Sequence, residues 1–239
     1  MIAAGLLLAA AAAVEVHPAG PVVPENLLRI ELRFAQPQRL PFAVDRVKLL
    51  DAQGVPLEGA LLDLALPGAD GRSFSVLMDP GRVKRGAGPN RDAGRALHAG
   101  DTVRLVVEDR VVKTWVVTEA VSHVLRPDAW QFESPRAGSR QALVVDLREP
   151  ISSTGESLIA VVDESGRRVR GQAALSHGDA VWTFRPAQPW RQGLHQLVLH
   201  PELEDPAGNR RCAAFEQVRG SEVRCDTPLA LPFEPLGDR

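Results

Sequence analysis

The sequence of 239 residues contains no tyrosine, only two cysteines and only 5% aromatic residues. The absence of tyrosine excludes the tyrosine-rich surfaces on which many recognition proteins rely. Charge of one sign is also lacking, because 28 Lys and Arg stand against 30 Asp and Glu, a net charge of −2. Such a chain has no overall field that would attract nucleic acid or an acidic membrane. We therefore expect no nucleic-acid partner, and any preference for anions must be local.

A hydrophobic run long enough to cross a membrane is missing too. Residues 2–14 are apolar and rich in alanine, but they are shorter than the roughly 20 residues of a spanning helix. Ala11 and Ala13 form an A-x-A cleavage pattern, although no Lys or Arg precedes the run. We interpret residues 1–13 as a signal peptide. The alternative, a first helix of a cytosolic protein, is disfavoured by three prolines within 18–24 and by the lack of a polar face.

Catalytic and metal-binding motifs are also absent from the sequence. It contains no G-x-S-x-G, no H-E-x-x-H and no Walker phosphate loop. His195 and His200 lie five residues apart on an expected strand, so they face opposite sides and cannot share a metal ion. A glycoside hydrolase pair remains open, because two carboxylates need only meet in space. We expect a protein that is not an enzyme and that has no cofactor and no metal.

What the sequence does contain is a repeat. Residues 27–107 and 142–215 show the same order of strand patterns, glycine turns and prolines. L-L-D-A-Q-G at Leu49–Gly54 matches V-V-D-E-S-G at Val161–Gly166 at an offset of 112 residues. Each glycine supplies the positive φ that such a turn needs. The length suits two sandwiches of about 100 residues each, so we predict an all-β fold with two tandem domains.

Alternation of apolar and polar residues marks the strands. In Leu27–Phe34 the odd positions Arg29, Glu31 and Arg33 alternate with apolar residues, which puts one face on a core and the other in water. Trp182 and Phe184 share a strand face and are expected in the core, with Trp190 packed at an edge. The further expected strands are 46–51, 73–78, 100–107, 111–118, 142–147, 157–163, 180–184 and 193–199.

These patterns divide the chain into six segments. They are a signal peptide at 1–13, a Pro-rich lead-in at 14–26, domain 1 at 27–120, a packed linker at 121–141, domain 2 at 142–218 and a C-terminal tail at 219–239. Cys212 and Cys225 are expected to form a disulfide in an oxidising compartment, which would pin the tail onto domain 2. Closing so short a loop stabilises by about 3 kcal/mol. The alternative is a metal site, which two thiols alone cannot complete.

The second copy carries motifs that identify a family resemblance. L-E-D-P-A-G-N at Leu203–Asn209 follows G-L-H-Q-L-V-L, and W-T-F-R-P-A-Q-P-W at Trp182–Trp190 precedes both. They resemble the bacterial Ig-like domains of surface-layer-type proteins, in which a D-x-x-G-N turn joins the last two strands of a seven-stranded sandwich. The first copy is similar but lacks that turn. The resemblance implies two tandem Ig-like β-sandwich domains in an extracytoplasmic setting, in a family whose members are mostly spacers and display modules.

The most basic stretch of the chain is the loop at 81–97. Its glycines would allow a close backbone approach to an anion such as a polyanionic glycan or phosphate. The candidate anion-binding residues are Arg82, Lys84, Arg85, Arg91 and Arg95. The alternative is a solvated insertion, or arginines that pair with the partner domain.

A second candidate site lies in the D-P-A-G-N turn. Asp205 and Asn209, with Glu202 and Glu204 nearby, offer the hard oxygen ligands that calcium takes. Asp and Asn also cap tight turns by bonding their own backbone. We interpret Asp205 and Asn209 as turn residues, with calcium as the alternative.

These observations lead to three hypotheses of function. We expect a non-enzymatic, periplasmic or secreted protein with no membrane span after signal cleavage. It would act as a binding, spacer or display module at the cell envelope, with an envelope glycan or another envelope protein as its partner. The alternative is a glycan-binding or glycan-processing accessory protein that uses the cleft between the domains, with the basic 81–95 loop at its mouth. A third is an assembly component whose partner adds a strand to an exposed edge.

Overall fold

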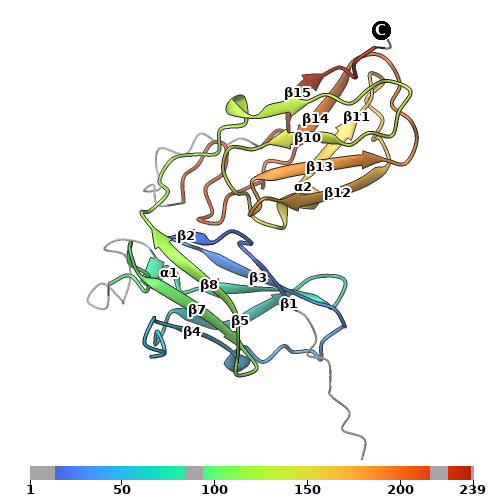
Figure 1. Ribbon diagram of the computed structural model, residues 1–239. Coiled ribbons are helices and arrows are strands. Elements are labelled where there is room, and N and C mark those ends of the chain that lie inside the picture. Colours follow the sequence, from blue (N-terminus) through green and yellow to red (C-terminus); the bar gives the residue numbers. More distant parts are fainter. Residues whose placement is uncertain (1–13, 84–93, 216–225, 238–239) are drawn as a thin grey trace, which may run out of the picture.

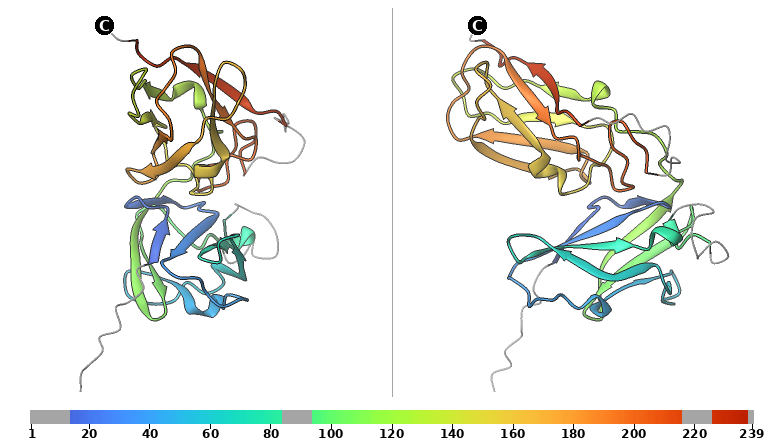
Figure 2. Two further views of the ribbon diagram at one scale, coloured as in Figure 1. Left: turned by 90° about the vertical axis from the view of Figure 1, so that its right-hand side faces the viewer. Right: turned by 180° about the vertical axis from the view of Figure 1, so that it is seen from behind.

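The structure is a computed structural model, and it describes residues 14–83, 94–215 and 226–237. Its regular structure is almost entirely β, so the prediction of an all-β fold is confirmed. The strands form four sheets around two separate hydrophobic cores. Figures 1 and 2 show the two resulting bodies stacked end to end. None of the helices in the described ranges has both the length and the apolar character that crossing a membrane requires.

The first body, here called the N-terminal half, is built from strands within residues 14–118. One sheet has the order β1-β3-β6-β5, formed by β1 (Val14–His17), β3 (Arg29–Phe34), β6 (Ser73–Met78) and β5 (Leu61–Pro67). The other has the order β2-β8-β7-β4, formed by β2 (Val22–Pro24), β8 (Arg110–Thr118), β7 (Thr102–Val107) and β4 (Val47–Leu50). All pairs are antiparallel except β2 with β8. Ile30, Phe74 and Trp115 lie in the core between the sheets.

The second body, the C-terminal half, is built from strands within residues 131–233. Its larger sheet has the order β12-β13-β10-β9, formed by β12 (Gly171–Ser176), β13 (Val181–Pro186), β10 (Leu143–Asp146) and β9 (Gln131–Glu133). The smaller sheet has the order β11-β14-β15, formed by β11 (Ile159–Val162), β14 (His195–Leu199) and β15 (Leu229–Phe233). Trp182 and Phe184 stack in its core, and Trp190 is buried beside them, as the sequence predicts.

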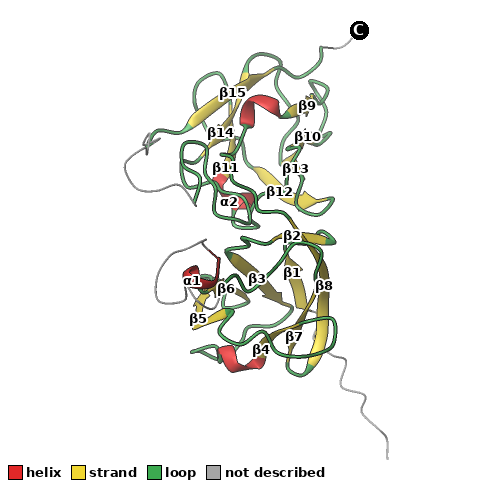
Figure 3. Cartoon of the chain, turned by 90° about the vertical axis from the view of Figure 1, so that its left-hand side faces the viewer, coloured by secondary structure: helices red, strands yellow, loops and turns green. Residues whose placement is uncertain are grey.

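Four short helices lie in the described loops of these sheets. They are η1 (Val44–Arg46), α1 (Pro80–Val83), η2 (Pro127–Ala129) and α2 (Gly155–Leu158). Of these, α2 lies on the side of the C-terminal half that faces the N-terminal half, as Figure 3 shows.

The predicted repeat is visible in matching turns. Asp51 Oδ1 accepts hydrogen bonds from the backbone N–H groups two and four residues later, each at 2.8 Å. Asp163 Oδ1 accepts the equivalent pair, each at 3.0 Å. Gly54 and Gly166 have the predicted positive φ, +86° and +77°. β4 and β11, which lead into these turns, each form the edge of a sheet. The offset of 112 residues therefore relates the same turn in the two halves.

The sheets extend beyond the predicted domain limits. β1 and β2 lie within the predicted lead-in at 14–26, β9 within the linker at 121–141, and β15 within the tail at 219–239. Each is three to five residues long and is interrupted or flanked by proline, so it shows no clear alternation. These strands form because a neighbouring strand offers a free edge, as when β15 pairs with β14. The lead-in and the tail are parts of the sheets.

Candidate functional site

The two halves meet on the outer face of β1 and β3. On β3, Arg29, Glu31 and Arg33 point away from the core, and on β1 their direct neighbours His17 and Glu15 lie opposite Glu31 and Arg33. The alternation predicts this face in water. Instead, loops of the C-terminal half cover it, and Glu31 and His17 are only 8% and 6% exposed. The polar face of the first predicted strand is a docking surface, which corrects the sequence-based expectation.

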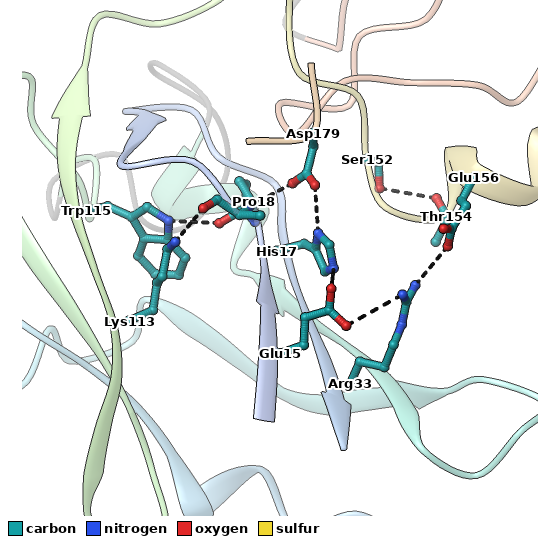
Figure 4. Close-up of polar contacts among 11 residues, drawn as sticks. Glu15, His17, Pro18, Arg33, Lys113, Trp115, Ser152, Thr154, Glu156 and Asp179 are labelled. Atoms are coloured by element: carbon teal, nitrogen blue, oxygen red, sulfur yellow. Dashed lines mark hydrogen bonds and ion pairs between the residues drawn. The ribbon is translucent and has the colours of Figure 1, made fainter. Parts of the chain in front are cut away.

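A row of charged side chains crosses the junction twice (Figure 4). His17 Nδ1 lies 2.9 Å from Asp179 Oδ1, and His17 Nε2 lies 3.3 Å from Glu15 Oε1. Glu15 Oε2 is 3.8 Å from Arg33 Nη1, while Arg33 Nη2 is 3.3 Å from Glu156 Oε2. Asp179 belongs to the turn between β12 and β13, and Glu156 to α2. The row therefore begins and ends on the C-terminal half, and its middle lies on the N-terminal half.

The backbone takes part in the same contact. The N–H of Ala19 donates a 2.7 Å hydrogen bond to Asp179 Oδ2. Trp115 Nε1 and Lys113 Nζ, both on β8, donate to the carbonyls of Pro18 and Ala19 at 3.0 and 2.5 Å. The segment after β1 is thus held from one side by β8 and from the other by the C-terminal half.

The D-P-A-G-N turn forms a second area of contact. The N–H of Leu28 donates to the carbonyl of Pro206 at 2.9 Å. Arg29 forms an ion pair with Glu204, whose side chain is 6% exposed. Asn209 Nδ2 donates to the carbonyl of Val121 at 3.0 Å, and Asn26 Nδ2 donates to the same oxygen at 2.8 Å. The chain between the two halves is thereby tied to both.

Asp205 and Asn209 have the contacts of turn residues. Asp205 Oδ1 accepts the N–H groups of Ala207 and Asn209 at 2.8 and 2.9 Å, and Oδ2 accepts Asn209 Nδ2 at 2.8 Å. Burial raises the pKa of Asp205 to about 6, although the hydrogen bonds from Asn209 oppose the rise. Within the ranges that the structure describes, no three His, Cys, Asp or Glu side chains are arranged to hold a metal ion.

Two more groups at the junction have raised pKa values. Burial by itself would lower the pKa of His17, but the hydrogen bond and charge of Asp179 and the charge of Glu15 outweigh it and raise the pKa above 6.5. Burial raises the pKa of the Glu31 carboxyl above 4.5, against the effect of a 2.6 Å hydrogen bond from Ser75. His17, Glu31 and Asp205 thus all keep their protons to a higher pH than the same groups in water.

Two of the larger clefts in the described part of the chain lie along the junction. One has a volume of about 390 Å³ and is polar, with Glu31, Arg33 and Ser73 on one side and Ser153, Thr154 and Glu156 on the other. The second, of about 200 Å³, is mainly apolar and is lined by prolines and valines, with His123 and Glu149 paired at 3.5 Å. The polar cleft offers hydroxyl groups, carboxylates and a guanidinium from both halves to one ligand.

Of the candidate anion site, only Arg82 and Arg95 lie in the described residues; Lys84, Arg85 and Arg91 lie outside them. Arg82 Nη1 donates to the carbonyl of Glu58 at 3.0 Å. Arg95 is 8% exposed, donates from Nε to the carbonyl of Val83 at 3.0 Å, and forms an ion pair with Glu25. Both arginines bind groups of their own half, and neither lines the two clefts.

The predicted disulfide also reaches beyond the described part of the chain. Cys212 follows the D-P-A-G-N turn within the described residues, whereas Cys225 lies outside them. The pairing of Cys212 with Cys225 stays a prediction.

His17 and Asp179 belong to no functional motif of the sequence, and alternation predicts a solvent-facing Glu31. The sequence contained one signal of the junction, the alternating charges of Arg29, Glu31 and Arg33 on one strand face. Such a face can pair with a surface of complementary charge as well as face water. His17 lies in the predicted lead-in, and Asp179 lies in the S-H-G-D turn 162 residues away. Nothing local in the sequence connects them.

No family model and no curated protein matches the sequence. Solved structures with some similarity include pullulanase type I from Bacillus subtilis, with a TM-score of 0.26 and 7% identity over 87% of this chain and 24% of that chain. Domains 4–9 of the surface layer protein SbsC have a TM-score of 0.27 and 10% identity over 94% of this chain and 31% of that chain. Domains 5–6 of the same protein have a TM-score of 0.26 and 10% identity over 95% of this chain and 97% of that chain. The chain thus spans a quarter to a third of the first two structures, and TM-scores this low carry no argument about fold or function.

Proposed function

We propose that the protein is a non-enzymatic, exported module of two Ig-like sandwiches that acts as a rigid spacer, binding or display element at the cell envelope. The strand order supports the Ig-like assignment. In each half a four-stranded sheet has the order of strands A, B, E and D of an immunoglobulin constant domain. β4-β7-β8 and β11-β14-β15 correspond to strands C, F and G. β2 adds an extra edge strand to the first copy.

The observation that carries the spacer proposal is the junction itself. Domains joined by a small polar interface normally move relative to each other. Here ion pairs and hydrogen bonds at separate places, around His17, Arg29, Arg33 and Val121, connect the halves. Contacts at several places define one relative orientation, which a spacer or display element needs.

Small-angle X-ray scattering at about pH 6, where the His17 imidazole is protonated, tests this rigidity. We expect the profile calculated from this one arrangement to fit the data. Arg29→Ala, which removes the arginine of the N-terminal half that pairs with the buried Glu204, should increase the maximum dimension. Arg104→Ala is the matched control, because Arg104 donates to the Ala52 carbonyl within the N-terminal half. A wild-type profile that requires many orientations would rule out the rigid spacer.

Export makes a separate prediction about the N-terminus. β1 begins at Val14, so cleavage after Ala13 would leave the whole strand in the mature protein. We expect mass spectrometry of the protein secreted by a bacterial host to give Val14 as the first residue. Recovery of the intact chain in the cytoplasm alone would refute export.

A glycan-binding accessory protein is the second candidate, and the polar cleft favours it. Sugar hydroxyls form hydrogen bonds with carboxylates, hydroxyls and guanidinium groups, and Glu31, Arg33, Thr154 and Glu156 bring these groups together. Arg82 and Arg95, the described arginines of the basic loop, lie outside this cleft, so the second candidate rests on the cleft residues alone.

Calorimetric titration with neutral glycans, anionic glycans and peptidoglycan fragments tests the cleft. Glu156→Gln should weaken binding at least tenfold, whereas Glu133→Gln, an exposed glutamate on β9, should not change it. A combined Arg82, Lys84 and Arg85→Ala variant separates the loop from the cleft. Binding that is lost only in the loop variant would refute the cleft and support the anion site.

A further inference from the structure

His17 lies between carboxylates of the two halves. Its Nδ1 faces Asp179 of the C-terminal half and its Nε2 faces Glu15 of its own strand, as Figure 4 shows. Only the Nδ1 contact with Asp179 is a hydrogen bond; Nε2 lies within ion-pair distance of Glu15 without hydrogen-bond geometry. A protonated ring carries a positive charge between the two carboxylates, whereas a neutral ring keeps at most the hydrogen bond to Asp179.

The carboxylate that His17 meets cannot easily turn away. Asp179 is 1% exposed, and its second oxygen already accepts the N–H of Ala19. Residues 177–179 all have positive φ, from 52° to 71°, and from this turn Asp179 contacts both His17 and Ala19 of the N-terminal half. On loss of the His17 proton, Asp179 would stay buried without its cationic partner.

The two arginines nearest to His17 on β3 already have carboxylate partners. Glu31 lies directly opposite His17 on β3 and adds a third carboxylate beside Glu15 and Asp179. Arg29 and Arg33 flank Glu31, but each is paired with a glutamate of the C-terminal half, Glu204 and Glu156. Deprotonation of His17 therefore leaves an excess of negative charge at this part of the junction.

We propose that His17 is a proton-operated latch between the two halves. With a protonated ring it ties β1 to the turn that carries Asp179. Without the proton the turn is released and the halves separate or become mobile. Acidic conditions tighten the junction, and neutral to mildly alkaline conditions loosen it.

The direction of the pH effect follows from where the proton binds more tightly. The pKa of His17 is higher when the halves are docked, so its contribution to docking is complete below pH 6.5. That contribution is lost as the pH rises through the pKa of His17 in the docked state. Glu31 acts in the same direction, because its raised pKa makes the docked state less favourable once the carboxyl ionises. Each unit by which the docked pKa of His17 exceeds 6.5 corresponds to an about tenfold stronger docking of the protonated form.

Two readouts on the purified protein test the latch between about pH 5.5 and about pH 8.5. NMR of the ring nitrogens should give His17 a pKa above 6.5. The amide resonance of Ala19 should titrate with the same midpoint, because its acceptor is Asp179. Small-angle scattering should show the maximum dimension increasing over the same range. A His17 pKa at or below 6.5, or scattering that does not change with pH, overturns the proposal.

Variants separate the latch from other histidines. His17→Gln should abolish the change in scattering between the two pH limits, whereas His98→Gln, an exposed histidine before β7, should retain it. Asp179→Asn should lower the His17 pKa, a readout that a purely structural role would leave unchanged. A pH response that persists in His17→Gln refutes the latch. The rigid spacer is tested at about pH 6, where the latch is closed, so a profile that does not change with pH would overturn the latch and leave the spacer standing.

Discussion

Gly178→Ala offers a direct test of how closely the two halves dock. Gly178 lies in the turn before Asp179 with a φ of +68°, and a Cβ built there would lie 2.9 Å from Gly20 Cα of the other half. A left-handed non-glycine residue costs roughly 1–2 kcal/mol wherever it occurs. At this position the backbone of Gly20 must also move, which stretches the contacts of Asp179 with His17 and Ala19. Loss of hydrogen bonds to a buried charge adds about 1–3 kcal/mol.

Gly166→Ala is the matched control. Its φ is +77°, in another turn of the same half, but a Cβ there would have no atom within 4 Å. Urea unfolding should show a loss of roughly 1–2 kcal/mol for Gly166→Ala and of about 2–5 kcal/mol for Gly178→Ala. Hydrogen exchange at the Ala19 amide should become faster only in Gly178→Ala. Equal losses of stability, with unchanged exchange at Ala19, would show that the backbones do not meet as described.

Three further predictions concern single residues. Arg95→Ala should lower the free energy of unfolding by about 3–5 kcal/mol in urea, because it breaks a buried ion pair with Glu25 and removes the hydrogen bond to the Val83 carbonyl. A loss below about 1 kcal/mol would fit a solvated arginine instead. In the wild type, the free energy of unfolding should fall as the pH rises from 3.8, the ordinary pKa of an Asp carboxyl, to about 6, the pKa of Asp205 in the folded protein. Asp205→Asn should reduce this fall by roughly 3 kcal/mol, and an unchanged slope would contradict the raised pKa. Trp115→Phe should cost about 0.5–1.5 kcal/mol more than Trp182→Phe in thermal unfolding, since both rings are buried but only Trp115 donates a hydrogen bond.

Much of the local structure was predictable because it depends on residues a few positions apart. Alternation over 27–34 predicts β3, and D-x-x-G predicts the turns at Asp51 and Asp163, whose carboxylates bond the same backbone groups in both copies. The core position of Trp182 follows from its strand face in the same way. Short strands such as β2 and β15 were not predictable, because three to five residues beside prolines contain no period that separates a strand from a loop.

The sequence by itself determined that the chain is all-β, that a module is repeated at an offset of 112 residues, and which face of each long strand is apolar. Only the tertiary structure decided what meets the polar face of β3. Alternation shows that Arg29, Glu31 and Arg33 share a side, but a charged face can meet water or a surface of complementary charge. That surface comes from Glu156, Asp179 and Glu204, more than 120 residues further along the chain. Long-range electrostatic complementarity leaves no periodic signal in a sequence, so the junction, its buried histidine and its clefts appear only when the two halves are folded together.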